Sequence, residues 1–264
     1  MRMQQLHVVR VGTGEPILVL HGLYSDHRQM LPLIPALHGY EAFIPDLLGH
    51  GASSKVPSTS IIEDNTDLLR TLCKAQGIRA VIAYSTSGLI ALELQLPHTI
   101  FVSSFCTNPL TEGPLKRLHG QEERIRNMLI TNRERAQQFF SKTLTRDVVM
   151  PGTRQASVEC AIDYLTSAQR DFTDLAKRIP HAMVIHGTKD WLVDYHLGAV
   201  LAQAAHAPLL FVPEDHWSIL RNKTVHGAIS TFLREASARP SRASVRARNA
   251  RAQEIKARAS RVDS

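Results

Sequence analysis

The fold class follows from one stretch of the sequence, Ala80-Val81-Ile82-Ala83-Tyr84-Ser85-Thr86-Ser87-Gly88. Residues 80–84 form a short, largely apolar run, which is typical of a strand buried on both faces inside a parallel sheet. Residues 86–96 predict a helix that ends before Pro97. A strand that turns at once into a helix leaves the hydroxyl group of Ser85 exposed above the edge of the sheet.

The same pattern of a short apolar strand followed by a helix recurs along the chain. Further strands are expected at 8–11, 17–20, 41–44, 99–103, 182–186 and 209–212, and further helices at 26–37, 61–77 and 197–204. The segment Ser60-Ile61-Ile62-Glu63 has the form of a capping box before the second of these helices. This alternation predicts an α/β fold, with a mostly parallel sheet, right-handed crossovers and helices on both faces.

One segment interrupts the alternation. From Cys106 to Thr173 the sequence shows helical patterns at 121–130, 133–140 and 158–168 and no convincing strand. A helical insertion between two strands of a parallel sheet is expected to cover the carboxyl ends of the strands. The sequence therefore predicts a core formed by residues 1–105 and 174–238 and a helical cap formed by residues 106–173.

The positive charge of the chain is concentrated at its C-terminal end. The net charge is +7, and residues 239–264 contain eight basic and two acidic side chains, so this segment carries nearly all of the excess. Its large apolar residues are Val245, Ile255 and Val262, which are too few to bury a core. We expect residues 239–264 to be a disordered, solvated tail, and contact with nucleic acid or another acidic partner is the alternative interpretation.

Composition also excludes several classes of protein. Apolar runs such as Ile17–Leu20 have the length of a strand, so no membrane span is expected, and no secretory signal is recognisable. The cysteines Cys73, Cys106 and Cys160 are odd in number and lack the spacing of metal ligands. We therefore expect a cytoplasmic globular protein with no metal ion and no organic cofactor.

Four more motifs follow other strands of the predicted sheet. They are Leu20-His21-Gly22-Leu23, Asp46-Leu47-Leu48-Gly49-His50-Gly51-Ala52-Ser53, His186-Gly187-Thr188-Lys189-Asp190 and Glu214-Asp215-His216-Trp217. Together with the Ser85 turn, these motifs resemble the α/β-hydrolase superfamily, in its capped, esterase-like or lipase-like branch. The resemblance runs from about Val8 to Glu235 and includes the order Ser, Asp, His. The chain departs from the family at the turn, where Ala83 and Ser87 replace the usual glycines.

The resemblance implies a role for five residues. Ser85 matches the nucleophile at the strand-to-helix turn (the nucleophile elbow), Asp190 the acid and His216 the base of a catalytic triad. Leu23 and Thr86 match the residues whose backbone amides form the oxyanion hole. The chemistry agrees, because a serine hydroxyl becomes a good nucleophile when a base removes its proton, and histidine does so near neutral pH.

Alternatives remain open at each position. Ser85 could merely cap a helix, Asp194 or Glu112 could replace Asp190, and His206 is the nearest rival of His216. His206 precedes the strand at 209–212, however, and so would lie at the opposite edge of the sheet. Four further residues have structural interpretations: His21, His50 and His186 as structural or pocket-lining side chains, and Asp46 as a partner of backbone groups.

These assignments predict a serine hydrolase that acts on a small-molecule carboxylic ester, including lactones and thioesters, through an acyl-enzyme. The alternatives are a carbon–carbon bond hydrolase or lyase that uses the same triad, and a binding protein that has kept the fold without turnover. A nucleic-acid-binding function would rest on the tail alone. The sequence leaves the acyl chain length, the leaving group and the oligomeric state open.

Overall fold

The computed structural model describes residues 4–109 and 156–238. The chain divides into two compact units, Met1–Ser230 and Thr231–Ser264. The first unit holds the sheet and all the residues discussed below. The described part of the second unit, residues 231–238, is helical.

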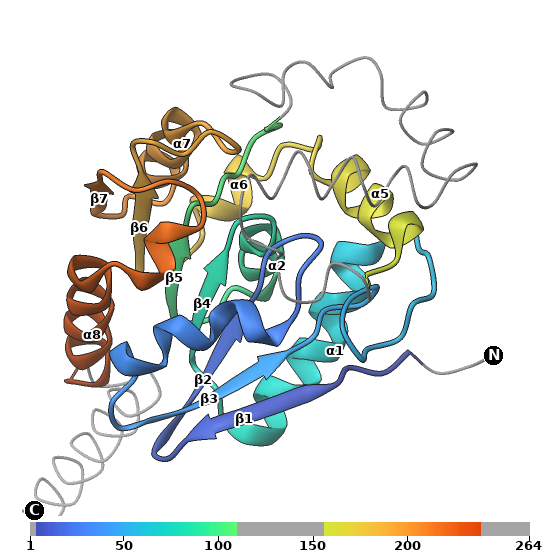
Figure 1. Cartoon of the computed structure of the whole chain (residues 1–264), viewed down its shortest axis with the longest axis horizontal. Coiled ribbons are helices and arrows are strands. Elements are labelled where there is room, and N and C mark those ends of the chain that lie inside the picture. Colours follow the sequence, from blue (N-terminus) through green and yellow to red (C-terminus); the bar gives the residue numbers. More distant parts are fainter. Residues whose placement is uncertain (1–3, 110–155, 239–264) are drawn as a thin grey trace, which may run out of the picture. The chain divides into compact units, whose positions relative to one another are not determined.

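The first unit is built on a seven-stranded sheet with the strand order β1-β3-β2-β4-β5-β6-β7 (Figure 1). The strands are β1 (Val8–Gly12), β2 (Glu15–Leu20), β3 (Tyr40–Pro45), β4 (Ala80–Tyr84), β5 (His98–Val102), β6 (Ala182–Gly187) and β7 (Leu209–Val212). β1 pairs with β3 in the antiparallel direction, and the other neighbouring strands pair in parallel. The predicted α/β fold with a mostly parallel sheet is therefore confirmed.

Helices follow most of the strands. Those of the described residues are η1 (His27–Ala36), α1 (Ile61–Gln76), α2 (Ser87–Leu94), α5 (Val158–Ser167), α6 (Thr173–Ala176), α7 (Tyr195–Ala204), η3 (Ser218–Arg221) and α8 (Lys223–Ala238). In Figure 1, η1 lies in front of strands β1 to β3 and α1 lies behind them. The buried strands β2 and β4 form the centre of the core, where Ile17–Leu20 and Val81–Tyr84 are fully buried. Each of the valine, leucine and isoleucine side chains among them contributes about 1.5–3 kcal/mol relative to exposure.

The helix expected from Asp26 to Leu37 is present as the 3-10 helix η1, in which Pro32 and Pro35 have no backbone N–H to donate. One local expectation was wrong. Ser60 precedes α1 as expected, but its side chain makes no capping hydrogen bond. The carboxylate of Glu63, the other half of the expected capping box, instead accepts a hydrogen bond from Arg170 at 2.5 Å.

Part of the predicted cap falls within the described residues. α5 matches the helix expected at 158–168, and it packs against α1. The Tyr164 hydroxyl on α5 accepts a hydrogen bond from Asn65 at 2.8 Å. The helices expected at 121–130 and 133–140, like the tail at 239–264, lie outside the described residues, so the boundaries of core, cap and tail stay predictions. No helix within 4–109 and 156–238 combines the length and the apolar character needed to cross a membrane.

Two buried histidines join the loop after β2 to the loop after β3. His21 Nε2 accepts from the backbone N–H of Leu47 at 3.0 Å, and His50 Nε2 accepts from that of Tyr24 at 2.9 Å. Each ring donates its Nδ1 proton to a nearby carbonyl, that of Gly22 at 2.7 Å and that of Leu48 at 2.9 Å. Both imidazoles therefore act as neutral crosslinks. Burial lowers the pKa of His21 and lowers that of His50 to about 3.

Replacing Gly77 by alanine should destabilise the fold through the backbone alone. Gly77 ends α1 with φ of +69°, and an added Cβ would meet no atom within 4 Å. An L-residue in this left-handed conformation costs about 1 kcal/mol. Gly227, inside α8, also has open space but no positive φ, so Gly227→Ala should stabilise by about 0.5–1 kcal/mol. Urea unfolding measures both changes, and effects of the same sign would contradict this interpretation.

The buried His50 ring should make the fold sensitive to acid. Its pKa is 6.5 in the unfolded chain and about 3 in the folded one, so between these values the unfolded state binds the extra proton. The contribution of His50 to stability is therefore present above pH 6.5 and lost as the pH falls toward 3. From pH 7 to pH 5, the wild type should lose about 2 kcal/mol more unfolding free energy than His50→Gln. Urea titrations at both pH values test this, with exposed His206→Gln expected to follow the wild type.

Candidate active site

Ser85 lies at the sharp turn between β4 and α2. Its backbone has φ of +57°, a left-handed conformation that residues other than glycine rarely adopt. Hydrogen bonds on both sides hold the turn: the Ser85 N–H donates to the Val102 carbonyl at 2.9 Å, and the Ser85 carbonyl accepts from the Ser104 hydroxyl at 2.8 Å. The strained conformation thus persists because neighbouring strands and loops determine it.

The residues after Ser85 explain how the turn tolerates its unusual sequence. The Ser87 hydroxyl accepts from the Tyr84 N–H at 3.0 Å, and it lies 2.8 Å from the Tyr84 carbonyl and 3.2 Å from the Leu20 carbonyl. The hydroxyl that replaces a usual glycine is therefore satisfied inside the turn. Gly88, in contrast, cannot carry a side chain, because an added Cβ would lie 1.7 Å from Ser104 Oγ.

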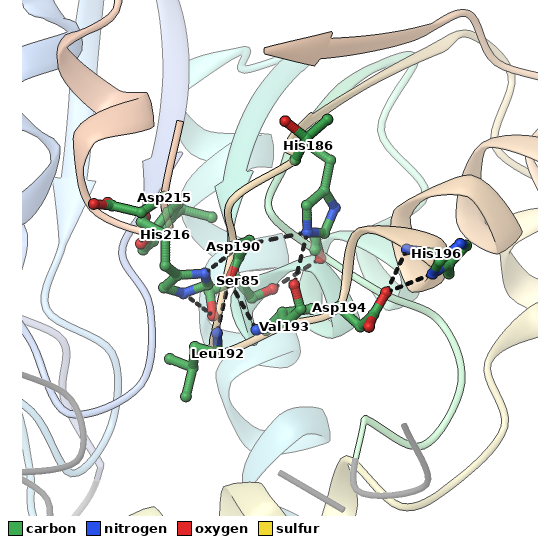
Figure 2. A network of polar contacts seen from close by, with 12 residues as sticks. Ser85, His186, Asp190, Leu192, Val193, Asp194, His196, Asp215 and His216 are labelled. Carbon is green, nitrogen blue, oxygen red and sulfur yellow. Dashed lines mark hydrogen bonds and ion pairs between the residues drawn. The ribbon is translucent and has the colours of Figure 1, made fainter. Parts of the chain in front are cut away.

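The structure brings Ser85, His216 and Asp190 together, although they are distant in sequence (Figure 2). His216 Nε2 lies 3.1 Å from Ser85 Oγ, and His216 Nδ1 lies 2.6 Å from Asp190 Oδ2. All three residues are buried. An ionised carboxylate can only accept, so the Nδ1 atom carries the proton and Nε2 is left as the acceptor that faces the serine hydroxyl.

Asp190 is surrounded by hydrogen-bond donors. Its Oδ1 atom accepts from the backbone N–H groups of Leu192 at 3.0 Å and Val193 at 2.9 Å. Burial by itself would raise the pKa of Asp190, but His216 and a second histidine, His186, hold this pKa well below its usual range. The loop after β6 therefore keeps a buried carboxylate ionised beside the imidazole.

His186 is the second histidine beside this carboxylate (Figure 2). Its Nε2 atom lies 3.1 Å from the Val193 carbonyl and 3.4 Å from Asp190 Oδ2. Both neighbours are acceptors, so Nε2 carries the proton. Its Nδ1 atom is buried without a hydrogen-bond partner in the described part of the chain, and an added Cβ at Gly198 would lie 2.2 Å from it. His186 is thus a structural residue next to the site, as one of the sequence interpretations expected.

Two residues that the sequence analysis did not single out hold His216 in place. The Tyr84 hydroxyl donates to the backbone carbonyl of His216, and the two rings lie 5.0 Å apart. Asp215 Oδ1 accepts from the N–H groups of Trp217 and Ser218, each at 2.8 Å, which shapes the turn into η3. A tyrosine inside a fully buried strand was the available signal for Tyr84, because a buried hydroxyl needs a partner.

The loop after β2 lies against Ser85. An added Cβ on Gly22 would be 3.2 Å from Ser85 Cβ and 3.0 Å from the Tyr84 ring, so a side chain there would press on both residues. Leu23 is the next residue along this loop, and Thr86 is the residue before α2. Within residues 4–109 and 156–238, the backbone N–H groups of Leu23 and Thr86 have no hydrogen-bond acceptor.

The rival residues lie elsewhere. Asp194 caps α7 by accepting from the His196 N–H at 2.9 Å, and its side chain pairs with the His196 ring. His206 is exposed and lies between α7 and β7, at the amino end of that strand. Asp46 accepts from the backbone N–H groups of His27 at 2.8 Å and Ala52 at 2.9 Å, in line with its structural interpretation. Glu112 lies outside the described residues.

The chain is similar to known proteins over its length and in its fold. Residues 17–228 match the model of the alpha/beta hydrolase family. Over 67 residues the chain is 37% identical to Lipase 3 of Moraxella sp. (strain TA144), which covers 25% of this chain and 21% of that protein. The chain therefore matches only about a fifth of the length of this curated relative.

Two solved structures share the fold. A bromoperoxidase from Bacillus anthracis has a TM-score of 0.73 at 18% identity, over 88% of this chain and 96% of its own. A thermophilic esterase from Thermogutta terrifontis has a TM-score of 0.71 at 22% identity, over 88% of this chain and 94% of its own. Because the family model spans most of the sequence, this chain belongs to the alpha/beta hydrolase family.

Proposed function

We propose that this protein is a serine hydrolase that cleaves a carboxylic ester, a class that includes lactones and thioesters. Ser85 is the nucleophile, His216 the general base and Asp190 the acid that orients the imidazole. The observation that carries the proposal is the continuous chain of contacts from Ser85 Oγ to His216 Nε2 at 3.1 Å and from His216 Nδ1 to Asp190 Oδ2 at 2.6 Å. A ligand-binding protein without turnover would have no need for this alignment.

The reaction begins when His216 Nε2 accepts the hydroxyl proton of Ser85 as Oγ attacks the acyl carbon. The imidazolium that forms is stabilised by the ionised Asp190, whose pKa is held low by the histidines around it. His216 then donates the proton to the leaving alkoxide or thiolate, and an acyl-enzyme on Ser85 remains. Water attacks this acyl group with His216 again acting as base, which releases the carboxylic acid and restores the serine.

The negative charge that develops on the carbonyl oxygen needs hydrogen-bond donors. The N–H groups of Leu23 and Thr86 supply them in this proposal, because both lie beside Ser85 in sequence or in space and neither is used by another described residue. Thr86 also directly precedes α2, where the helix dipole favours negative charge. Donors of this kind contribute about 3–4 kcal/mol each to the stability of the transition state.

Similarity to a lipase and to an esterase favours an ester as the bond that is cleaved. Carbon–carbon bond cleavage by the same three residues is the competing function. A panel of p-nitrophenyl esters, thioesters and lactones, assayed beside vinylogous diketones, separates the two. Turnover of the diketones alone would reject the ester proposal.

Replacing Ser85 by alanine should abolish turnover of a short p-nitrophenyl ester, lowering kcat by ~10³-fold or more, because no other group accepts the acyl chain. A fluorophosphonate probe should label the wild type and leave Ser85→Ala unlabelled. The matched control is Ser60→Ala, since this exposed serine makes no capping hydrogen bond and its loss should leave labelling unchanged. Labelling of Ser85→Ala at the wild-type level would show that Ser85 is not the nucleophile.

Substituting Asp190 and Asp194 by asparagine separates the acid from its rival. Asp190→Asn keeps the shape of the site but removes the charge that selects the tautomer of His216, so kcat should fall by ~10⁴-fold. Asp194→Asn affects only the cap of α7 and the exposed contact with His196, so turnover should remain within about twofold. Steady-state kinetics at pH 7.5 measures both, and a larger loss for Asp194→Asn would transfer the role of acid to Asp194.

A further inference from the structure

A second cluster of reactive side chains lies outside the Ser85 site. His7, His27 and Asp46 each offer one ligand atom, and these atoms all lie within 4.8 Å of one another. They come from three places in the fold: His7 directly precedes β1, His27 opens η1, and Asp46 directly follows β3. Their sequence spacing has no recognisable pattern, so only the fold brings them together.

Backbone hydrogen bonds fix the positions from which these side chains extend. The Asp46 N–H donates to the His7 carbonyl at 2.8 Å, and the His7 N–H donates to Ser53 Oγ at 2.8 Å. His27 is joined to the same carboxylate twice, since its backbone N–H and its Nδ1 atom each lie 2.8 Å from Asp46 Oδ1. The three residues are therefore held together before any ligand binds.

The cluster is buried on one side and open on the other. Asp46 is fully buried, whereas His27 is partly exposed and His7 is exposed. Gly51 leaves room beside the carboxylate, because an added Cβ there would lie 2.2 Å from Asp46 Oδ2. The two imidazoles are thus more exposed to solvent than the carboxylate beside them.

We propose that His7, His27 and Asp46 bind a divalent transition-metal ion such as Zn²⁺. Two neutral imidazoles and one carboxylate are a ligand set that zinc, nickel and copper prefer, and calcium and magnesium do not. Around tetrahedral zinc, with bonds of about 2.0–2.1 Å, ligand atoms lie about 3.3 Å apart. The three candidate ligand atoms lie within 4.8 Å of one another, so they would move closer together when the ion binds. Water would complete the coordination from the open side.

The ion would join the start of β1, the start of η1 and the loop after β3. It would bind the folded chain and not the unfolded one, so it would stabilise the first unit. The loop after β2 runs through Leu23 to His27, but the ion would touch neither Ser85 nor His216. The proposal is therefore independent of the proposed ester hydrolysis.

Zinc titration of the full chain, after removal of metal by a chelator, tests the site by calorimetry and by thermal unfolding. The wild type should bind with a one-to-one stoichiometry and unfold at a higher temperature with Zn²⁺. His7→Ala and His27→Ala should each weaken binding at least tenfold and abolish the thermal shift. Asp46 is left intact in these variants because its carboxylate also bonds backbone N–H groups.

The matched control is His196→Ala. His196 Nδ1 lies 2.8 Å from Asp194 Oδ1, the same contact as between His27 and Asp46, but this pair is not part of a three-ligand group among the described residues. The control should bind zinc like the wild type. Circular dichroism without metal establishes that the variants are folded. The proposal would be overturned if His196→Ala lost as much zinc affinity as the His7 and His27 variants. It would also be overturned if both His7→Ala and His27→Ala bound zinc as tightly as the wild type.

Discussion

The left-handed backbone of Ser85 is the constraint on which the candidate active site depends. A residue with φ of +57° is strained, and the turn persists because the surroundings leave it no alternative. The Ser104 hydroxyl donates a hydrogen bond to the Ser85 carbonyl, and a side chain on Gly88 would collide with this hydroxyl. The strain aims the serine hydroxyl at His216 and leaves the next backbone N–H at the start of a helix. One unfavourable conformation thus prepares two requirements of the proposed chemistry.

The candidate active site also requires that the buried carboxylate of Asp190 stays ionised. A lone buried carboxylate would become protonated, and it could then no longer accept the Nδ1 proton of His216. Two backbone N–H groups and two histidines compensate for the loss of water around it. In this arrangement the Nδ1 atom of His186 stays buried without a hydrogen-bond partner among the described residues, which is energetically unfavourable.

Histidines in this protein differ in role because their surroundings differ. His21 and His50 are fully buried between backbone groups and stay neutral, so they serve as crosslinks between loops. His216 faces a carboxylate on one side and a hydroxyl group on the other, which suits proton transfer. His7 and His27 are open to solvent beside a buried carboxylate, which suits a metal ion. Histidine content alone could not distinguish these cases.

The sequence alone determined the class of fold, because buried strands and the turns after them leave local signals of apolar runs, glycine and proline. Ser85, Asp190 and His216 were named by the resemblance of the sequence motifs to the α/β-hydrolase superfamily. The sequence failed at Glu63, whose carboxylate pairs with Arg170 instead of capping α1, because this outcome depended on a side chain from another part of the chain. Only the tertiary structure decided that Asp190 and not Asp194 meets His216, that Tyr84 holds the backbone of His216, and that His7, His27 and Asp46 converge. Such contacts join residues that are far apart in the chain, and their distances are set by strand pairing and loop packing, which no local pattern records.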